Sequence, residues 1–277
     1  MLSCLNPATA AMPDPEEFLR LAGRWGFKGA DHGADFWAEW AHRRSLDYVR
    51  EVCEDTGCVI AHGGLPVNFR EDDDTFKADL KRLPRIAATM KGLDTTAMST
   101  WIAPVTHDEP RLCYERHVRR LREVARVLDD AGLVLGLEFV GPKTSRREGT
   151  PFIFDMTGML GLCADVHDRC GLLLDSYHWY TSHATVDDLL SLTANQVVHV
   201  HINDAYPEPI DTLLDMKRML PGAGVIDLAG FLGALARIGY DGPVAVETFN
   251  DSLKAAGPEE AARLAGRAMA RVMDGYV

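Results

Sequence analysis

Short apolar runs alternate along this chain with longer stretches in which apolar residues recur at helical spacing. A run of four to eight apolar residues suits a buried strand, and apolar positions three or four residues apart suit a helix that packs on one face. Alternating strands and helices are typical of βα units in a parallel sheet. We expect strands at residues 2–5, 29–32, 58–62, 96–102, 134–139, 171–175, 197–202 and 244–247, and helices at 15–25, 45–55, 74–90, 109–131, 155–169, 185–193, 227–238 and 258–274.

Helix boundary signals support this division. The residues from Thr185 to Asp188 resemble a capping box in which Asp replaces Glu, and Asp227 suits an N-cap. Glycines at positions 132, 171 and 239 fall where helices are expected to end.

Repeated βα units over 277 residues predict an α/β protein, a (β/α)8 TIM barrel that forms a single domain over residues 1–277. A doubly wound open sheet is the main alternative. It is disfavoured because no GxGxxG turn follows the first expected strand. The chain also contains no low-complexity tract or linker that would divide it.

Composition narrows the class of protein. The formal net charge is −12, which disfavours binding to the phosphate backbone of nucleic acid. No apolar run reaches the length of about 20 residues needed to cross a membrane, and the first residues lack the basic and apolar regions of a signal peptide. The six cysteines show no CxxC pair and are interpreted as reduced thiols. We therefore expect a cytoplasmic protein with no nucleic-acid or membrane partner.

Ionisable residues end four successive expected strands, the fifth to the eighth: Glu138, Asp175, His201 and Glu247. Each of them alone is readily explained as a solvated rim residue, a helix cap or a buried hydrogen-bonded histidine. Together they are expected at one rim of the barrel, where charged groups next to apolar strands need compensation. Three carboxylates and one imidazole suit a divalent metal, with Mn²⁺ expected first and Mg²⁺, Co²⁺ or Zn²⁺ as alternatives.

Strand alternation adds His199, which faces inward with His201 and is interpreted as a buried structural residue that supports the site. His62 and Trp101 end the third and fourth expected strands, so both are expected to reach the barrel mouth. There they either bind substrate, with the aromatic face stacking on a sugar ring, or pack against the loops. Lys143, in the loop after Glu138, either binds a substrate oxygen or is a solvated charge.

Four segments carry a family resemblance: LGLEFVGPK around Glu138, LLLDSYHWY around Asp175, VVHVHINDA around His201 and the stretch from LPGAG to AVETF that contains Glu247. At these segments the chain resembles the xylose isomerase-like TIM-barrel superfamily, and within it the sugar phosphate isomerase/epimerase group. The resemblance implies that the two glutamates, the aspartate and the histidine hold one divalent metal. It also implies that Glu138 and Glu247 act as catalytic acid and base, and that His178 contacts substrate oxygens.

The chain departs from ketose 3-epimerases, which it otherwise resembles, at two positions. Their arginine shortly after the metal histidine is missing, and Arg218 in the same long loop is the candidate to supply this charge. Their glutamate six residues after the first ligand is Thr144 here. Endonuclease IV, a DNA-repair relative, needs further metal ligands that this chain lacks.

The sequence thus predicts a divalent-metal-dependent sugar isomerase or epimerase. It would abstract a proton next to a carbonyl through a metal-stabilised enediolate. The alternatives are a metal-dependent lyase acting on a keto-sugar, similar to inosose dehydratases or 3-oxo-C-glycoside deglycosidases, and a non-catalytic sugar-binding accessory subunit. The expected partner is a small sugar or keto-sugar, and the resemblance implies a possible homo-oligomer.

Overall fold

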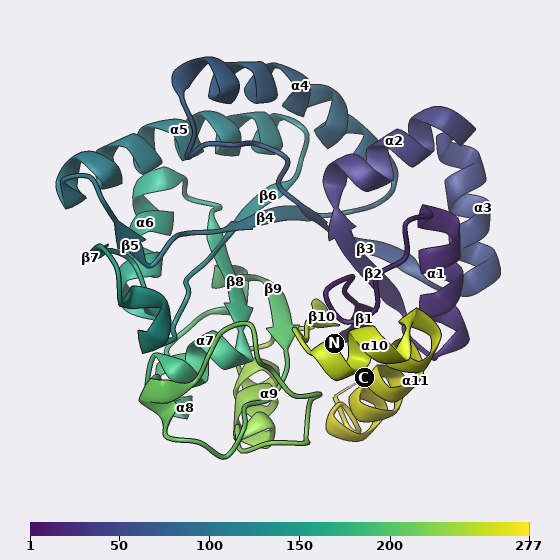
Figure 1. Ribbon diagram of the computed structural model, residues 1–277. Helices are drawn as coiled ribbons and strands as arrows, with labels where there is room; N and C mark the ends of the chain where they lie inside the picture. Colours follow the sequence, from purple (N-terminus) through teal and green to yellow (C-terminus); the bar gives the residue numbers. More distant parts are fainter. Residues whose placement is uncertain (277) are drawn as a thin grey trace.

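The computed structural model describes residues 1–276 and contains a closed parallel barrel surrounded by helices (Figure 1). The barrel is closed because β1 pairs with both β2 and β10, which confirms the (β/α)8 architecture and excludes an open doubly wound sheet. In their order around the barrel the strands are β1 (Leu2–Leu5), β2 (Gly29–Gly33), β3 (Val59–Gly64), β4 (Ala97–Trp101), β6 (Val134–Glu138), β8 (Gly171–Asp175), β9 (Val197–Ile202) and β10 (Pro243–Val246).

The outer layer consists of helices that connect successive strands (Figure 1). The longer ones are α1 (Pro15–Arg24), α2 (Ala34–Arg44), α3 (Leu46–Thr56), α4 (Asp73–Gly92), α5 (Pro110–Asp130), α6 (Met156–Val166), α9 (Leu228–Arg237) and α11 (Pro258–Val272). Short helices complete the connections: α7 (Ser176–Thr181), α8 (Val186–Leu190), α10 (Asp251–Ala256), η1 (Lys143–Arg146), η2 (Ala194–Gln196) and η3 (Ile210–Thr212).

Local capping fixes several helix ends as the sequence predicts. Thr185 and Asp188 form a reciprocal capping box at α8, and the Asp227 side chain accepts the Gly230 amide at the start of α9. Gly132 and Gly239 adopt positive φ values of 74° and 86°, which glycine adopts without steric cost. The expectation that a helix ends at residue 171 is wrong, because that glycine begins β8.

Helix α2 is an element that the sequence analysis missed. The chain passes from β2 directly into this helix, and its N-cap Gly33 makes no side-chain capping hydrogen bond. The usual polar start signal of a helix is therefore absent. Two short strands, β5 (Val105–Thr106) and β7 (Thr150–Pro151), also form a small antiparallel pair outside the barrel.

The main core lies between the barrel and its helices, and the barrel interior is packed separately. A small apolar cluster within the barrel comprises Cys4, Ala61 and Ala245. The remaining interior is polar, with the buried side chains of Asp31, His62, Ser99, Glu138, Asp175, His199 and His201. This unusual concentration of buried polar groups marks where the chemistry of the molecule lies.

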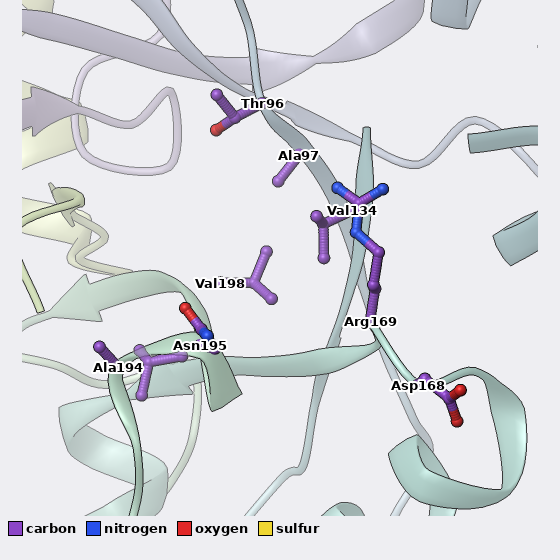
Figure 2. Close-up of a pocket in the computed structure, with 9 residues that line it drawn as sticks. Thr96, Ala97, Val134, Asp168, Arg169, Ala194, Asn195 and Val198 are labelled. Atoms are coloured by element: carbon purple, nitrogen blue, oxygen red, sulfur yellow. The ribbon is translucent and has the colours of Figure 1, made fainter. Parts of the chain in front are cut away.

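The opposite end of the barrel contains a pocket of about 440 Å³, which Figure 2 shows. Its lining includes Thr96, Val134 and Val197, which lie at or just before the N-terminal ends of β4, β6 and β9. In barrels of this kind, chemistry is carried at the C-terminal strand ends. This pocket is therefore separate from the polar interior described above.

The two ends of the described chain lie together, since the Met1 amino group donates a hydrogen bond of 2.9 Å to the Tyr276 carbonyl (Figure 1). Within residues 1–276, no helix combines the length and the apolar character needed to span a membrane.

Candidate metal centre

Neighbouring strands bring the four rim residues together. Glu138 ends β6, Asp175 ends β8, His201 lies near the end of β9, and Glu247 directly follows β10. These strands are adjacent in the order β6, β8, β9, β10, and Asp175 is paired in register with His201. The Nδ1 atom of His201 is 3.6 Å from Glu138 Oε1, 4.0 Å from Asp175 Oδ2 and 3.5 Å from Glu247 Oε2. One imidazole nitrogen therefore faces three carboxylates.

Two atoms at the centre of this cluster are buried and lack a hydrogen-bond partner within the described residues: Glu138 Oε1 and His201 Nδ1. Their separation of 3.6 Å is too long for a hydrogen bond. Leaving two buried polar atoms unsatisfied costs about 1–3 kcal/mol each. A divalent cation accepts electron pairs from both atoms at once, so the donor set fits a metal of the kind that the sequence predicts.

The protonation of His201 is fixed from its other side. Its Nε2 is 2.9 Å from Oδ2 of Asp31, a carboxylate that can only accept a hydrogen bond. The Nε2 proton is therefore held by Asp31. Burial lowers the pKa of His201, but Glu247, Asp31 and Glu138 outweigh burial and raise this pKa well above its usual value, so Nδ1 also attracts a proton, whose place a bound cation would take. A carboxylate that accepts the remaining ring N–H commonly orients a metal-binding histidine in this way.

The electrostatics of the two glutamates differ. Burial raises the pKa of Glu138, and its neighbouring histidines offset this only in part. Burial acts in the same direction on Glu247, but His201 and Arg218 outweigh it and hold the pKa of Glu247 at about 2. The cluster thus contains two carboxyl groups in unequal environments, an arrangement that supports separate acid and base roles.

A second group of potential ligands lies beside the first: Asp31, His62 and His199. Here most of the polar atoms are paired with one another, and His199 Nδ1 is the one ring nitrogen of the group that is buried without a hydrogen-bond partner within the described residues. Asp31 accepts from Asn6 Nδ2 at 2.8 Å and lies 2.9 Å from His62 Nδ1 and 3.2 Å from His199 Nε2. The rings of His62 and His199 stack with centroids 3.9 Å apart. The described contacts thus explain this group as a hydrogen-bonded support for His201.

Arg218 occupies the side of the cluster that faces the long loop after β9. Its guanidinium is buried, with Nη1 at 2.8 Å from Asp175 and 2.9 Å from Glu247, and Nη2 at 2.7 Å from Asp215. The sequence analysis proposed that this residue supplies a positive charge to the site, and the structure brings it there. Because three carboxylates surround it, its charge is neutralised by the protein itself.

His178 lies on helix α7, directly after β8. Its Nδ1 lies 3.3 Å from the Gly141 amide and its Nε2 lies 3.3 Å from Arg218 Nη2, and both of these neighbours are donors. The Nε2 atom is also 4.0 Å from Glu138 Oε1. His178 is therefore placed beside the cluster, and its role toward a substrate stays a prediction.

Lys143 points away from the cluster in the structure. Its Nζ is 2.6 Å from Asp211, its side chain is 62% exposed, and within residues 1–276 it makes no ion pair with the rim carboxylates. This geometry agrees with the interpretation of Lys143 as a solvated charge and not with that of a residue that binds a substrate oxygen.

The expectation that His62 reaches the barrel mouth is wrong. A β-bulge places Ala61 as an extra residue between Ile60 and His62, and β3 continues to Gly64. His62 therefore faces the interior, where its Nε2 lies 2.8 Å from Ser99 Oγ. A bulge re-aims a side chain in this way because it adds one residue to one strand only.

Trp101, by contrast, is 49% exposed at the end of β4 and is paired in register with Glu138. It therefore lies on the rim as the sequence predicts, and its contact with a substrate stays a prediction.

Three polar residues outside the expected set of ligands complete the cluster. Asp31 orients His201, Asp215 pairs with Arg218, and Asn203 donates from Nδ2 to Asp175 at 3.0 Å. Asp31 carries a usable signal, because it is an acidic residue inside an expected strand. Asp204 has a structural role, since it accepts from the Gly224 and Ile226 amides and anchors the loop that carries Arg218.

Comparison with known proteins agrees with this architecture. The family model described as xylose isomerase-like TIM barrel matches residues 19–272. A solved structure of a xylose isomerase domain protein from Alicyclobacillus acidocaldarius is 32% identical, with a TM-score of 0.91 over 99% of this chain and 98% of that one.

Two curated relatives are similar over parts of their length. Inosose isomerase of Bacillus subtilis is 29% identical over 156 residues, which are 56% of this chain and 54% of the relative. The 3-dehydroshikimate dehydratase of Pseudomonas putida is 29% identical over 257 residues, which are 90% of this chain and 38% of the relative. The chain thus spans about half or less of the length of these relatives. The match of the family model over most of the sequence shows that the chain belongs to the xylose isomerase-like TIM-barrel family.

Proposed function

We propose that this chain is a divalent-metal-dependent enzyme that isomerises or epimerises a sugar-like substrate by moving a proton at the carbon next to a carbonyl. The observation that carries the proposal is the pair of unsatisfied buried atoms, Glu138 Oε1 and His201 Nδ1, which face each other among three carboxylates. A protein retains such a costly arrangement where a cation or a reaction uses it.

Glu138, Asp175, His201 and Glu247 would hold the metal. When bound, it would supply Lewis-acid polarisation of the substrate carbonyl, which acidifies the neighbouring C–H bond. Mn²⁺ is expected first, with Mg²⁺, Co²⁺ and Zn²⁺ as alternatives, because three oxygens and one nitrogen suit these ions.

Glu138 and Glu247 would carry the proton. Glu138 ends β6 and Glu247 follows β10, and their carboxylate oxygens lie 3.6 Å and 3.5 Å from His201 Nδ1. One carboxylate would remove the proton from carbon, and the other would return it, from the opposite face in an epimerase. His178 would contact a substrate hydroxyl through Nε2, which lies 4.0 Å from Glu138 Oε1 and 3.3 Å from Arg218 Nη2.

A lyase is the second candidate. The same loss of a proton next to a carbonyl allows a substituent on the following carbon to leave, which gives dehydration in place of isomerisation. The similarity to the dehydratase of Pseudomonas putida over 90% of this chain supports the lyase as a second candidate. The two candidates share every step up to the fate of the deprotonated substrate.

Product analysis in deuterated water tests the proposal. The purified protein is loaded with Mn²⁺ and incubated with ketoses, inososes and 3-oxo-glycosides, and NMR follows deuterium incorporation next to the carbonyl. Isomer or epimer formation with deuterium uptake supports an isomerase, and loss of water or an aglycone supports the lyase. Glu247→Gln should abolish turnover while the fold stays intact. Near-normal turnover by this variant would refute the assigned role.

Measuring the metal content of the purified protein distinguishes an isomerase or a lyase from a non-catalytic sugar-binding subunit. An enzyme of the proposed type binds about one equivalent of Mn²⁺ and loses turnover when a chelator removes it. A protein without stoichiometric metal and without turnover on the panel would favour the accessory subunit.

A further inference from the structure

Arg218 is a buried cation inside the cluster of expected metal ligands, and its side chain is 1% exposed. Nη1 donates to Asp175 Oδ2 at 2.8 Å and to Glu247 Oε2 at 2.9 Å. Nε donates to the Asp215 carbonyl oxygen at 3.0 Å, and Nη2 lies 2.7 Å from Asp215 Oδ1 and 3.3 Å from His178 Nε2. Each N–H group of the guanidinium thus has a partner within the described residues.

Asp175 is equally saturated. Its Oδ1 accepts the backbone amides of Tyr177 and His178 at 2.6 Å and 3.1 Å. Its Oδ2 accepts from Asn203 Nδ2 at 3.0 Å and from Arg218 Nη1 at 2.8 Å. An ionised carboxylate offers about four lone-pair sites, and these donors occupy them. In this arrangement Asp175 has no lone pair left for a metal ion.

The oxygen in question is Asp175 Oδ2, which lies 4.0 Å from His201 Nδ1 at the centre of the cluster. A cation bound to both residues needs a lone pair of this oxygen, so one of its present donors has to leave. The Asn203 amide is held at both ends, since its oxygen accepts from Ser176 Oγ at 3.1 Å and its nitrogen also donates to the Glu247 carbonyl at 3.2 Å. The guanidinium is the donor that an arriving cation repels.

Arg218 retains a second partner if it leaves Asp175. Asp215 precedes it by three residues and is 26% exposed, so this partner lies toward solvent. The backbone of Arg218 is fixed at the rim, because its amide donates to the Phe249 carbonyl at 3.0 Å and its carbonyl accepts from Asn250 Nδ2 at 3.0 Å. A change of side-chain rotamer is therefore enough to move the guanidinium, and the loop backbone can stay in place.

We propose that Arg218 is an exchangeable counter-cation of the metal centre. In the metal-free protein its guanidinium neutralises Asp175 and Glu247, and it leaves Asp175 Oδ2 and stays with Asp215 when a divalent ion binds. The inference rests on the proposed function, because it takes the metal centre as given. Its consequence is that Arg218 lowers the affinity of the site for metal, since each binding event breaks a charge-assisted hydrogen bond. The same pairing compensates the buried carboxylates while no ion is bound.

Calorimetric titration of chelator-treated protein with Mn²⁺ tests the exchange. Arg218→Met removes the charge and the donors and retains an apolar side chain. This variant should bind Mn²⁺ about ten- to a hundredfold more tightly than the wild type, because it lacks the hydrogen bond to a charged group that the wild type has to break. Arg218→Lys retains the charge without the fork, and its affinity should lie between the two. Equal or weaker binding by Arg218→Met overturns the proposal.

Arg120→Met is the matched control. Arg120 is another buried arginine that pairs with an aspartate, Asp73, and it belongs to helix α5 outside the barrel. Its replacement should leave the affinity for Mn²⁺ within about twofold of the wild type. A tightening as large as that of Arg218→Met would show that the loss of any buried arginine has this effect, and it overturns the exchange.

Asp215→Asn should change the affinity in the opposite direction. Without this carboxylate the guanidinium has less to hold it away from Asp175, so Mn²⁺ should bind at least about twofold more weakly. In the Arg218→Met background the same substitution should have little effect, because the guanidinium through which it acts is gone. An equal loss of affinity in both backgrounds is a direct effect of the Asp215 charge, and it overturns the role of Asp215 as the second partner.

A crystal structure of the Mn²⁺-loaded wild type observes the exchange without any substitution, and it decides the question if Arg218→Met fails to fold. Nη1 of Arg218 should lie beyond hydrogen-bond distance of Asp175 Oδ2, while Nη2 remains on Asp215. An ion bound to Asp175 with the 2.8 Å contact to Arg218 unchanged overturns the proposal.

The titrations also separate this inference from the proposed function. If the wild type binds Mn²⁺ and Arg218→Met binds it no more tightly, the exchange is overturned and the metal centre stands. If Arg218→Met alone binds Mn²⁺, both are supported, and Arg218 is the group that excludes the ion from the wild type. If neither protein binds Mn²⁺, the metal centre is refuted and the exchange is refuted with it.

Discussion

The two ring nitrogens of His201 face different chemical environments. Nε2 lies 2.9 Å from the Asp31 carboxylate, whereas Nδ1 faces Glu138 and Glu247 without a hydrogen-bond partner. The carboxylate on one side thus determines which nitrogen is available on the other. Asp31 acts through His201 and is a positioning residue.

Asp31→Asn should weaken Mn²⁺ binding about ten- to a hundredfold, the range found when the partner of a metal-bound histidine is removed. The neutral amide no longer holds the proton on Nε2 as strongly, so Nδ1 becomes a poorer ligand. Calorimetric titration with Mn²⁺ measures the change. Asp129→Asn, which removes a carboxylate paired with Arg169 beside the pocket of Figure 2, should leave the affinity unchanged. Equal affinities for Asp31→Asn and the wild type would contradict this role.

At the scale of elements, the loop after β6 is held against helix α7. A Cβ atom added at Gly141 would lie 2.3 Å from the His178 carbonyl oxygen and 2.7 Å from Thr181 Oγ1. The backbone of α7 approaches the loop so closely that glycine alone fits. This contact connects the element that carries Glu138 with the one that carries His178.

Gly141→Ala should therefore reduce the free energy of unfolding by about 1–3 kcal/mol, as overpacking does, and should lower turnover by displacing His178. Urea unfolding and steady-state kinetics measure the two effects. Gly161→Ala provides the matched control, because an added Cβ there meets nothing within 4 Å in helix α6. That change should stabilise the protein by up to about 1 kcal/mol. The prediction fails if both substitutions have the same sign.

Helix α5 contains a buried histidine that should make stability depend on pH. His117 is 5% exposed, and its Nδ1 atom lies 2.8 Å from the Cys113 carbonyl oxygen. Burial lowers the pKa of His117 to about 4. The folded protein thus keeps this ring neutral at a pH where the unfolded chain, with a pKa of about 6.5, already binds a proton. Acid therefore favours the unfolded state.

Above about pH 6.5, the neutral His117 ring should not lower the free energy of unfolding. As the pH decreases from there to about 4, the free energy of unfolding should fall by roughly 2–3 kcal/mol. His117→Asn keeps a donor near the Nδ1 position but does not titrate, so its unfolding free energy should depend less on pH in this window. Urea unfolding at several pH values measures the difference. His42→Asn, on the exposed end of α2, should retain the wild-type profile. An identical profile for His117→Asn would show that other groups dominate.

At the scale of the molecule, the proposed metal would join strands that are distant in sequence. Its ligands come from β6, β8 and β9 and from the residue after β10, and these adjacent strands form about half of the barrel wall. A ligand that binds the native state alone stabilises it by about 2.7 kcal/mol at a concentration of 100 times its dissociation constant.

Saturating Mn²⁺ should therefore raise the melting temperature by roughly 5–10 °C for a chain of this size. Calorimetry with and without a chelator measures the shift, and excess chelator should reverse it. Glu138→Gln and His201→Gln should lose most of the shift. If these variants respond to Mn²⁺ as the wild type does, the ion binds elsewhere.

Much of the architecture follows from local patterns in the sequence. The β1, β8 and β9 strands have the bounds expected from their apolar runs, and the other barrel strands differ by a few residues at their ends. Helix α2 was not predicted because its start carries no side-chain cap. The helices expected at 155–169 and 185–193 end three residues earlier, at Val166 and Leu190. The spacing of apolar residues indicates which face of a helix or strand is buried. It does not locate the boundary where a strand passes directly into a helix without a polar capping residue.

The sequence by itself determined the barrel, through alternating strands and helices, and the location of Glu138, Asp175, His201 and Glu247 at the strand ends of one rim. Only the tertiary structure decided how these charges are arranged. The bulge in β3 moved His62 inward, Arg218 was paired with three carboxylates, and Asp31 was brought to His201 from 170 residues away. The physical reason is that strand and helix formation depend on neighbours along the chain, whereas compensation of buried charge depends on neighbours in space.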